Sequence, residues 1–287
     1  MNIPRLYLLV GLPGSGKSSF AKIRKDSGVI ISSDEIREEL FGDARIQDNS
    51  GQVFELMRKR AHDALEKGSD VYWDATNMTR KARLSAISCK TPETKVNAYV
   101  IWNTLDRCIE LDSLRDRTVG KDVIMRMAKN FQFPFYDEGI QNIQIFLSED
   151  AIGSNADEIN PLEGTKINQD NPHHTRTIYD HCLAAYDYAL NKEMDQQVRT
   201  AAKYHDCGKP EVKNFIDSRG NFSEVAHYYG HQGVSAWKAT GWIDDPETLW
   251  LISSHMEPFF DSKYYNNMSP WMRNLIDQLH EADMAAH

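Results

Sequence analysis

A glycine-rich segment near the start of the chain, residues 11–18, matches the pattern G-x-x-x-x-G-K-[ST]. It follows an apolar run and opens a helical stretch, which is the context in which this pattern binds phosphates. Backbone N–H groups are expected to wrap the phosphates, with Lys17 at the β- and γ-phosphates and the Ser18 hydroxyl on Mg²⁺. The pattern therefore predicts a site for ATP or another nucleoside triphosphate. The expected contact residues are Gly11, Pro13, Gly14, Ser15, Gly16, Lys17, Ser18 and Ser19.

An acidic residue, Asp34, follows the apolar run 29–31, and Arg37 comes three residues later. A helix that begins here would place both side chains on one face. Because open α/β sheets bind ligands at the carboxyl ends of their strands, Asp34 is a candidate to accept the proton of an attacking hydroxyl. Arg37 is then a candidate to hold an anionic acceptor. The alternative for Asp34 is a helix N-cap beside a solvated arginine.

A second acidic residue, Asp74, ends the apolar run 71–73. A carboxylate in this position lies on the Mg²⁺ side of the phosphates in many enzymes with the glycine-rich pattern. Thr76 and Asn77 follow, and we expect both to face the reacting groups. Together with residues 11–18, this segment predicts phosphoryl-transfer chemistry in the first half of the chain.

The second half of the chain carries residues suited to metal binding. His205 and Asp206 are adjacent, and such a pair can ligate one cation. Lys209 follows, where it would neutralise a phosphate oxygen in a transition state. Mixed imidazole and carboxylate ligands fit Mn²⁺, Ni²⁺ or Fe better than Mg²⁺. For each histidine taken alone, the alternative to a ligand role is a buried position in the core. The candidate ligands for one or two divalent ions are His181, His205, Asp206, His231, His255 and Asp283.

The elements that must position these residues differ between the two halves. Apolar runs in the first half alternate with helical periodicity, which predicts an α/β domain with a parallel sheet flanked by helices. Apolar residues in the second half recur three and four apart, which predicts an all-α domain. The expected strands are 6–10, 28–31, 71–73, 96–102 and 143–146, and the expected helices include 52–65, 177–190, 195–205, 231–239 and 246–255.

Composition and charge agree with two domains. The 287 residues carry a net charge of −9, and counting along the chain places the whole acidic excess after residue 150. Nine of the ten histidines also lie after residue 172, as expected for a cation site. Polar, Pro and Gly residues between the halves predict a linker. The predicted division is 1–150 for the α/β domain, 151–170 for the linker and 171–287 for the all-α domain.

Several classes of protein are excluded. The apolar runs are far shorter than the roughly 20 residues of a membrane-spanning helix, and the first residues lack the layout of a signal peptide. We therefore expect a cytoplasmic protein with no membrane partner. The four cysteines form no C-x-x-C pair, which argues against zinc ribbons and redox motifs and predicts reduced thiols.

The first half, over roughly residues 4–147, resembles the polynucleotide 5′-kinase family of P-loop phosphotransferases. The resemblance rests on residues 11–18, the segments 32–37 and 74–77, Arg115-Asp116-Arg117 before 123–127, and the segment 133–139. It implies that Asp34 is the general base for the 5′-hydroxyl and that Arg37 contacts a phosphate of the acceptor strand. It also implies a lid arginine that stabilises the transferring phosphoryl group. The family usually shows two lid arginines four apart, but here they are two apart, so Arg115 and Arg117 both remain candidates.

The second half, over roughly residues 171–287, resembles the HD phosphohydrolase superfamily through the order H…HD…H…H…D. The segments 171–174, 179–181 and 229–236 look like the HD domains attached to tRNA nucleotidyltransferases. The resemblance implies that His181, His205, Asp206 and Asp283 bind a first metal, and that His231 and His255, with Asp206 bridging, bind a second. Such a pair of ions would activate a water and hold a scissile phosphate. For His173, His174 and His227, indirect support of the ligands, phosphate contact and a surface position all remain open.

A 5′-hydroxyl kinase joined to a phosphohydrolase predicts nucleic-acid end healing. We expect transfer of the γ-phosphate of ATP to 5′-hydroxyl ends, and removal of 2′- or 3′-phosphates or opening of 2′,3′-cyclic phosphates. The expected partners are nucleic-acid ends, with RNA favoured over DNA, and a ligase that acts afterwards; no oligomeric state is predicted. The basic clusters 58–60 and 80–83 would line a groove for the strand or form solvated helix faces.

Two other functions compete with end healing. One is a kinase for small molecules or nucleotides fused to a nucleotidase, because relatives with the same core phosphorylate small molecules. The other is a non-catalytic regulator whose second half senses a nucleotide. The combination of Lys17, Asp34, His205, Asp206 and Lys209 argues against the regulator, because a binding module needs neither a base nor ligands that activate water.

Overall fold

The computed structural model describes residues 3–24, 28–44, 46, 50–115, 117–148, 160–162, 164–172 and 175–287. The chain divides into two compact units. Unit 1 comprises Met1–Met125 and Pro134–Ser154, and unit 2 comprises Arg126–Phe133 and Asn155–His287. Residues 151–159 of the predicted linker, Asp116, His173 and His174 lie outside the described residues. Within the described part of the chain, no helix is both long and apolar enough to cross a membrane.

Unit 1 is built on a parallel five-stranded sheet with the strand order β2-β3-β1-β4-β5. The central strand β1 is buried from Leu6 to Val10, as expected for a parallel strand covered on both faces. Each predicted strand is confirmed to within one residue at either end. The strands are β1 (Arg5–Val10), β2 (Val29–Ser32), β3 (Val71–Asp74), β4 (Lys95–Trp102) and β5 (Asn142–Leu147).

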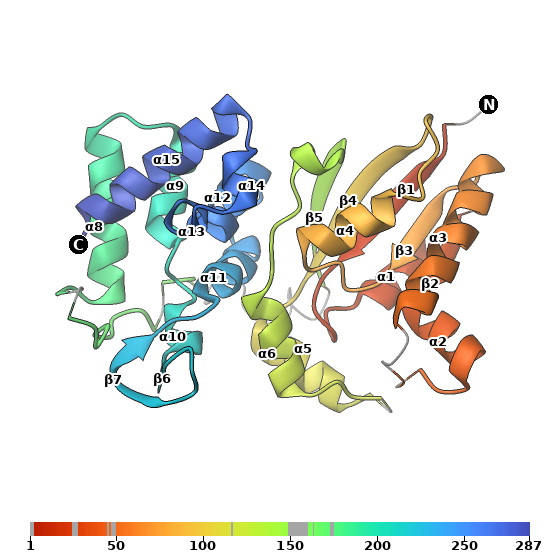
Figure 1. The fold of residues 1–287 in the computed structure, drawn as a ribbon, viewed down its shortest axis with the longest axis horizontal. Coiled ribbons are helices and arrows are strands. Elements are labelled where there is room, and N and C mark those ends of the chain that lie inside the picture. Colours follow the sequence, from red (N-terminus) through yellow and green to blue (C-terminus); the bar gives the residue numbers. More distant parts are fainter. Residues whose placement is uncertain are drawn as a thin grey trace. The chain divides into compact units, whose positions relative to one another are not determined.

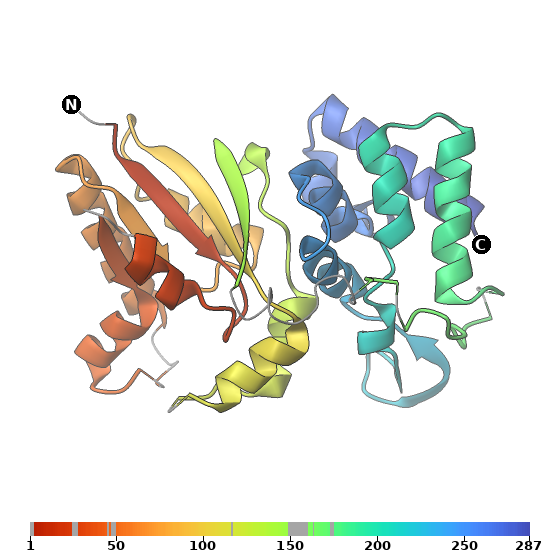
Figure 2. The ribbon, with the colours of Figure 1, turned by 180° about the vertical axis from the view of Figure 1, so that it is seen from behind.

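Helices cover both faces of this sheet, with α1 and α4 on opposite sides (Figures 1 and 2). Ala21 of α1 packs in a cluster with Leu9 and with the rings of Tyr7 and Tyr72. These two rings are stacked, and their centroids are 4.6 Å apart. Because all strands are parallel, their carboxyl ends meet at one edge of the sheet. The helices of this part are α1 (Lys17–Arg24), α2 (Ser33–Phe41), α3 (Ser50–Glu66), α4 (Arg80–Ile87) and α5 (Leu105–Ser113), with the short 3₁₀ turn η1 (Tyr136–Glu138). Helix α6 (Lys121–Lys129) begins in unit 1, and its residues from Arg126 group with unit 2.

A buried ion pair joins α4 to η1. Arg83 donates two hydrogen bonds to the Glu138 carboxylate, at 2.8 and 2.6 Å, and a third to the backbone carbonyl of Asn77 at 3.0 Å. Both side chains are at most 1% exposed. The expectation that the basic cluster 80–83 lines a groove or a solvated face is therefore wrong for Arg83, because a glutamate 55 residues away neutralises it inside the unit.

Unit 2 is mainly helical but is not all-α. A two-stranded antiparallel hairpin, β6 (Asn214–Ile216) and β7 (Phe222–His227), overturns that prediction. Most of its side chains are at least partly exposed, so its sequence lacks the apolar alternation of a half-buried strand. The helices are α8 (Ile178–Asn191), α9 (Gln196–Tyr204), α10 (Lys209–Val212), α11 (His231–Thr240), α12 (Pro246–Ser254), α13 (Glu257–Phe260), α14 (Lys263–Asn266) and α15 (Pro270–Ala285).

Two segments join unit 2 although the sequence assigns them elsewhere. Residues 126–133 group with this unit, where Phe131 packs edge-on against Trp237 at 5.3 Å. Residues 164–170 fall in the predicted linker, yet Thr165 and Gln169 are buried. The backbone N–H of Ile178 also donates to the carbonyl of Ile167 at 3.1 Å. These contacts place the described part of the linker within the packed unit.

The buried pair in unit 1 gives a prediction about stability. Arg83→Ala leaves the Glu138 carboxylate buried without its partner, so we expect the free energy of unfolding to fall by about 3–5 kcal/mol. The matched control is Arg80→Ala, which removes a partly exposed pair with Asp137 from the same helix and is expected to cost less than about 1 kcal/mol. Urea unfolding of the two variants measures the difference, and equal losses would contradict it.

Candidate functional site

The phosphate cradle connects β1 to α1 at the carboxyl edge of the sheet. Gly14 and Gly16 have φ angles of +79° and +96°, which residues with a side chain rarely adopt. A Cβ on Gly14 would also clash with the backbone carbonyl of Cys108, because α5 lies directly against the cradle. Glycine is thus required at position 14 by both the backbone conformation and the close contact.

Three polar side chains lie together where α1 begins. Lys17 is buried, and its ammonium donates to the carbonyl of Leu12 at 2.7 Å. Burial lowers the pKa of Lys17 to about 8, although the nearby Asp74 carboxylate opposes the shift. The Ser18 hydroxyl donates to Asp74 Oδ2 at 2.8 Å. A hydroxyl and a carboxylate in contact beside a cradle are oxygen ligands of the kind Mg²⁺ takes with phosphates, so these residues fit the predicted ion.

Asp34 lies in the first turn of α2, but it does not cap the helix. Ser32 is the N-cap, and its hydroxyl accepts the N–H of Glu35. The Asp34 carboxylate is instead 3.1 Å from Arg37 and 2.8 Å from Arg117, and 46% of this side chain is exposed. A carboxylate that solvent and an acceptor can reach, held between two guanidinium groups, fits a base that works beside an anionic substrate.

The remaining predicted residues of unit 1 differ in what they contact. Asn77 does not face the reacting groups, because its buried side-chain amide donates to the carbonyl of Leu9 at 2.7 Å. It therefore ties the segment after β3 to β1. The backbone carbonyl of Thr76 accepts the N–H of Gly11 at 3.0 Å, which joins this segment to the cradle. Arg115 lies 3.8 Å from Asp112 rather than on Asp34, so Arg117 alone of the two lid candidates contacts the predicted base.

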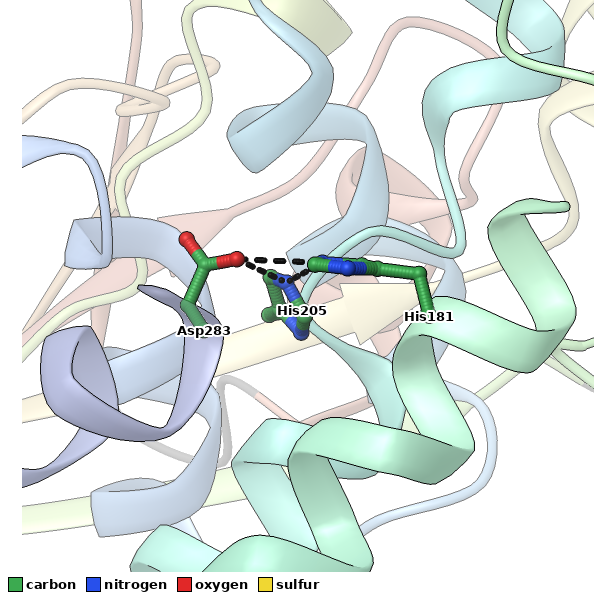
Figure 3. Close-up of side chains that lie close together, drawn as sticks. All are labelled: His181, His205 and Asp283. Carbon is green, nitrogen blue, oxygen red and sulfur yellow. Dashed lines mark hydrogen bonds and ion pairs between the residues drawn. The ribbon is translucent and has the colours of Figure 1, made fainter. Parts of the chain in front are cut away.

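The six candidate metal ligands converge in unit 2 from the ends or first turns of five helices. They form two groups, and within each group the ligand atoms lie within 4.8 Å of one another. Figure 3 shows the first, in which His181 Nε2 is 3.2 Å from His205 Nε2 and 3.0 Å from Asp283 Oδ1. The supporting helices are α8, α9, α11, α12 and α15, and all six side chains are buried.

The carboxylate of Asp206 lies between the two groups. Its Oδ2 is 3.4 Å from both His181 Nε2 and His205 Nε2. Its Oδ1 is 3.1 Å from His231 Nε2 and 3.8 Å from His255 Nε2. One oxygen therefore faces each group, which is the arrangement expected of a bridging ligand.

The hydrogen bonds of the four histidines fix which ring nitrogen carries a proton. The Nδ1 atoms of His205, His231 and His255 each lie 2.8 Å from a backbone carbonyl, and that of His181 lies 3.4 Å from one. A carbonyl only accepts, so each Nδ1 carries a hydrogen and each Nε2 faces the centre of the cluster. The Nε2 atoms of His231 and His255 are only 3.0 Å apart. Ring nitrogens that converge in this way can share a proton or hold a metal cation, so the residues fit one or two divalent ions.

Charge in the cluster is unevenly distributed. Burial lowers the pKa of His205, but Asp206 and Asp283 outweigh it and raise that pKa to about 10. Burial and the neighbouring imidazoles lower the pKa of His255 to about 3. Burial opposes ionisation of Asp206, yet Lys209 and His205 hold its pKa well below the usual range. A divalent ion bound at the first group would displace the proton held on His205.

Contacts around Lys209 were not foreseen from the sequence. Its ammonium lies 2.6 Å from Asp206, donates to Gln169 Oε1 at 2.9 Å and sits 5.3 Å from the centre of the Tyr228 ring. Gln169 falls in the predicted linker, so no local pattern points to it. His227, whose role the sequence left open, does not join the cluster and instead stacks on Tyr229.

Comparison with known proteins covers mainly the first unit. The family described as an AAA domain matches residues 6–134, which contain the cradle and none of the six metal ligands. No curated protein matches the chain. Together with the parallel sheet and the cradle, the family match defines unit 1 as an α/β P-loop domain.

Three solved structures are similar to part of the chain. A chain of the Pnkp1/Rnl/Hen1 RNA repair complex is 22% identical over 44% of this chain and 43% of its own, with a TM-score of 0.40. A second Pnkp1/Rnl/Hen1 complex gives 24% identity over 38% and 39%, with a TM-score of 0.35. A gluconokinase from Sinorhizobium meliloti 1021 gives 13% identity over 50% and 84%, with a TM-score of 0.36. The chain thus spans about two fifths of the two repair-complex chains.

The lowered pKa of Lys17 predicts that nucleotide binding depends on pH. Protonated Lys17 is the form that attracts phosphates, so above about pH 8 binding must also take up a proton. The dissociation constant of Mg·ATP should then rise by up to about tenfold per pH unit. Titration calorimetry across this range measures the slope. Lys17→Met should bind weakly and without this slope, and Lys22→Met, an exposed change in the same helix, should keep it. Identical profiles for all three proteins would contradict the assignment.

The shared position of Asp206 predicts how metal content responds to substitution. The wild-type chain, loaded with Mn²⁺ and dialysed, is expected to retain two ions, as the two groups of ligands imply. Asp206→Ala removes a ligand from both groups and should leave one ion or none, whereas Asp283→Ala affects the first group only. Elemental analysis of dialysed protein gives the ratio. His227→Ala, a histidine outside the cluster, is the control, and wild-type metal content in Asp206→Ala would rule out bridging.

Proposed function

We propose that this chain heals broken nucleic-acid ends. Unit 1 transfers the γ-phosphoryl group of ATP to a 5′-hydroxyl, and unit 2 removes a 2′- or 3′-phosphate or opens a 2′,3′-cyclic phosphate. The observation that carries the proposal is the presence, in one chain, of a phosphate cradle beside an accessible carboxylate and of six converging metal ligands. Each end of a break would be treated by a different unit.

The residues of unit 1 support phosphoryl transfer to a hydroxyl. Asp34 accepts the proton of the 5′-hydroxyl while the hydroxyl oxygen bonds to the γ-phosphorus. The bond between the γ-phosphorus and the β–γ bridging oxygen breaks, which releases ADP. Lys17 stabilises the charge on the phosphates. Ser18 and Asp74 would hold Mg²⁺, which neutralises the β- and γ-phosphates when bound. The two arginines on Asp34 favour an acceptor that carries its own phosphate, such as a nucleic-acid strand, over a neutral sugar.

The residues of unit 2 support hydrolysis of a phosphate ester. His181, His205 and Asp283 would hold one divalent ion, His231 and His255 would hold the other, and Asp206 would bridge the two. When bound, such ions supply an activated water and a positive clamp for the scissile phosphate. Lys209 adds a fixed cation at the same carboxylate. Mn²⁺, Ni²⁺ and Fe suit this mixed set of nitrogen and oxygen ligands.

The combination of the two reactions favours RNA as the substrate. A 2′,3′-cyclic phosphate forms only on a strand that has a 2′-hydroxyl, so an enzyme that opens it acts on RNA ends. Phosphorylation leaves a 5′-phosphate. Opening of a cyclic phosphate leaves a 2′- or 3′-phosphate, and hydrolysis of that monoester leaves a hydroxyl. A 5′-phosphate and a 3′-hydroxyl are the ends that a ligase joins, so a ligase acting afterwards is the expected partner.

The test uses RNA and DNA oligonucleotides with a 5′-hydroxyl and either a 3′-phosphate or, for RNA, a 2′,3′-cyclic phosphate. With radiolabelled ATP and Mg²⁺, the wild-type chain should label the 5′ end. With Mn²⁺ or Ni²⁺, it should release phosphate from the 3′ end. Asp34→Ala should abolish labelling and spare phosphate release, because the two sites use different residues. Asp206→Ala should do the reverse.

The control for both variants is Asp63→Ala, which removes an exposed carboxylate from α3 and should change neither reaction. Label appearing on nucleosides or other small molecules instead of oligonucleotides would assign unit 1 to metabolite phosphorylation. The absence of both reactions and of bound metal would favour a regulator. Loss of both reactions in either folded variant would contradict two independent sites.

A further inference from the structure

One buried carboxylate of unit 1, that of Asp112, belongs to none of the groups described above. It lies near the end of α5, and its side chain is 1% exposed. Its Oδ2 accepts hydrogen bonds from the backbone N–H groups of Val119 at 2.9 Å and Gly120 at 3.0 Å. Its Oδ1 makes no hydrogen bond within the described residues and faces the guanidinium of Arg115 at 3.8 Å.

These hydrogen bonds close the connection between α5 and α6. Val119 and Gly120 directly precede α6, so a single carboxylate oxygen joins the end of one helix to the start of the next. Gly120 has a φ angle of +88°, which lets its N–H and that of Val119 point to the same oxygen. Asp112 therefore sets the distance between the two ends of the connection.

Arg115 and Arg117 both lie on this closed connection. Arg117 reaches Asp34, 2.8 Å away, and Arg115 pairs with Asp112 itself. One turn before Asp112, the carbonyl of Cys108 lies against Gly14, so α5 is fixed on the cradle. A shift of the connection would change the position of both guanidinium groups relative to the cradle and to Asp34.

We propose that Asp112 is a positioning residue for phosphoryl transfer, which holds Arg117 on the predicted base and Arg115 beside the cradle. This inference rests on the proposed kinase function of unit 1. It explains why a charge is buried here, since burying a carboxylate is unfavourable unless hydrogen bonds and an opposite charge compensate it. The charge of Arg115 agrees with a position beside the cradle, because it adds to the effect of burial in lowering the pKa of Lys17.

The two contacts of Asp112 can be separated by substitution. Asp112→Asn keeps an oxygen that accepts the two N–H groups but turns an NH₂ group toward Arg115. Asp112→Ala removes both contacts. The matched control is Glu110→Ala. Glu110 also lies on α5 and pairs at 2.8 Å with Arg107, an arginine three residues away, as Arg115 is from Asp112. A difference between these variants therefore reports the connection and not the loss of an acidic residue from α5.

The experiment measures steady-state phosphorylation of a 5′-hydroxyl oligonucleotide together with amide hydrogen exchange. Misplacement of catalytic groups by about 1 Å lowers rates by about 100-fold, so this is the expected fall in kcat for Asp112→Ala, with the KM for ATP within about threefold. Asp112→Asn should give an intermediate kcat, and Glu110→Ala should match the wild type. The amides of Val119 and Gly120 should exchange faster in Asp112→Ala but not in Asp112→Asn.

The outcomes separate the two hypotheses. A wild-type chain that labels no oligonucleotide contradicts the proposed function itself. An active wild type with Asp112→Ala at more than half its kcat, or with the KM for ATP raised as far as kcat falls, overturns the positioning role. If thermal unfolding shows that Asp112→Ala is not folded, Asp112→Asn decides: a wild-type kcat would show that the pairing with Arg115 has no role, and overturn the inference.

Discussion

The burial of the Asp206 carboxylate among four imidazoles and one ammonium organises unit 2. The Lys209 ammonium, 2.6 Å away, and the charge held on His205 compensate the removal of this carboxylate from water. The outer nitrogens of those histidines are tied to backbone carbonyls, so each ring has one orientation. The ends or first turns of the five helices that carry these ligands therefore meet at one point.

The Asp34 carboxylate of unit 1, unlike the buried Asp206, is accessible to solvent. Asp34 is nearly half exposed and is held by Arg37 from its own helix and by Arg117 from a distant connection. In the proposed reaction an incoming hydroxyl must reach this carboxylate. The ligands of unit 2 would instead gain from exclusion of water, which strengthens their interaction with a cation. Burial thus differs between the two sites as their proposed reactions require.

The cations available for an acceptor strand are fewer than the composition suggests. Arg83 is neutralised inside unit 1, Arg60 pairs with Glu39 at 2.6 Å, and Arg58 donates to Ser85. In the proposed reaction, Arg37 and Arg117 beside Asp34 would contact a phosphate of the acceptor strand. Binding through few phosphate contacts would depend weakly on salt, as the proposed recognition of strand ends requires.

Local patterns in the sequence determined the strands of unit 1 and the cradle, whereas the six residues that converge in unit 2 were predicted from their order along the chain. The strands and the cradle depend on the residue types within a short segment, because hydrophobic period and glycine content act over a few residues. Tertiary structure decided that Ser32 and not Asp34 caps α2, and that Arg117 and not Arg115 contacts Asp34. It also decided that Asn77 is structural and that two exposed segments form a hairpin. These features depend on partners far away in the sequence, and packing alone brings such partners together.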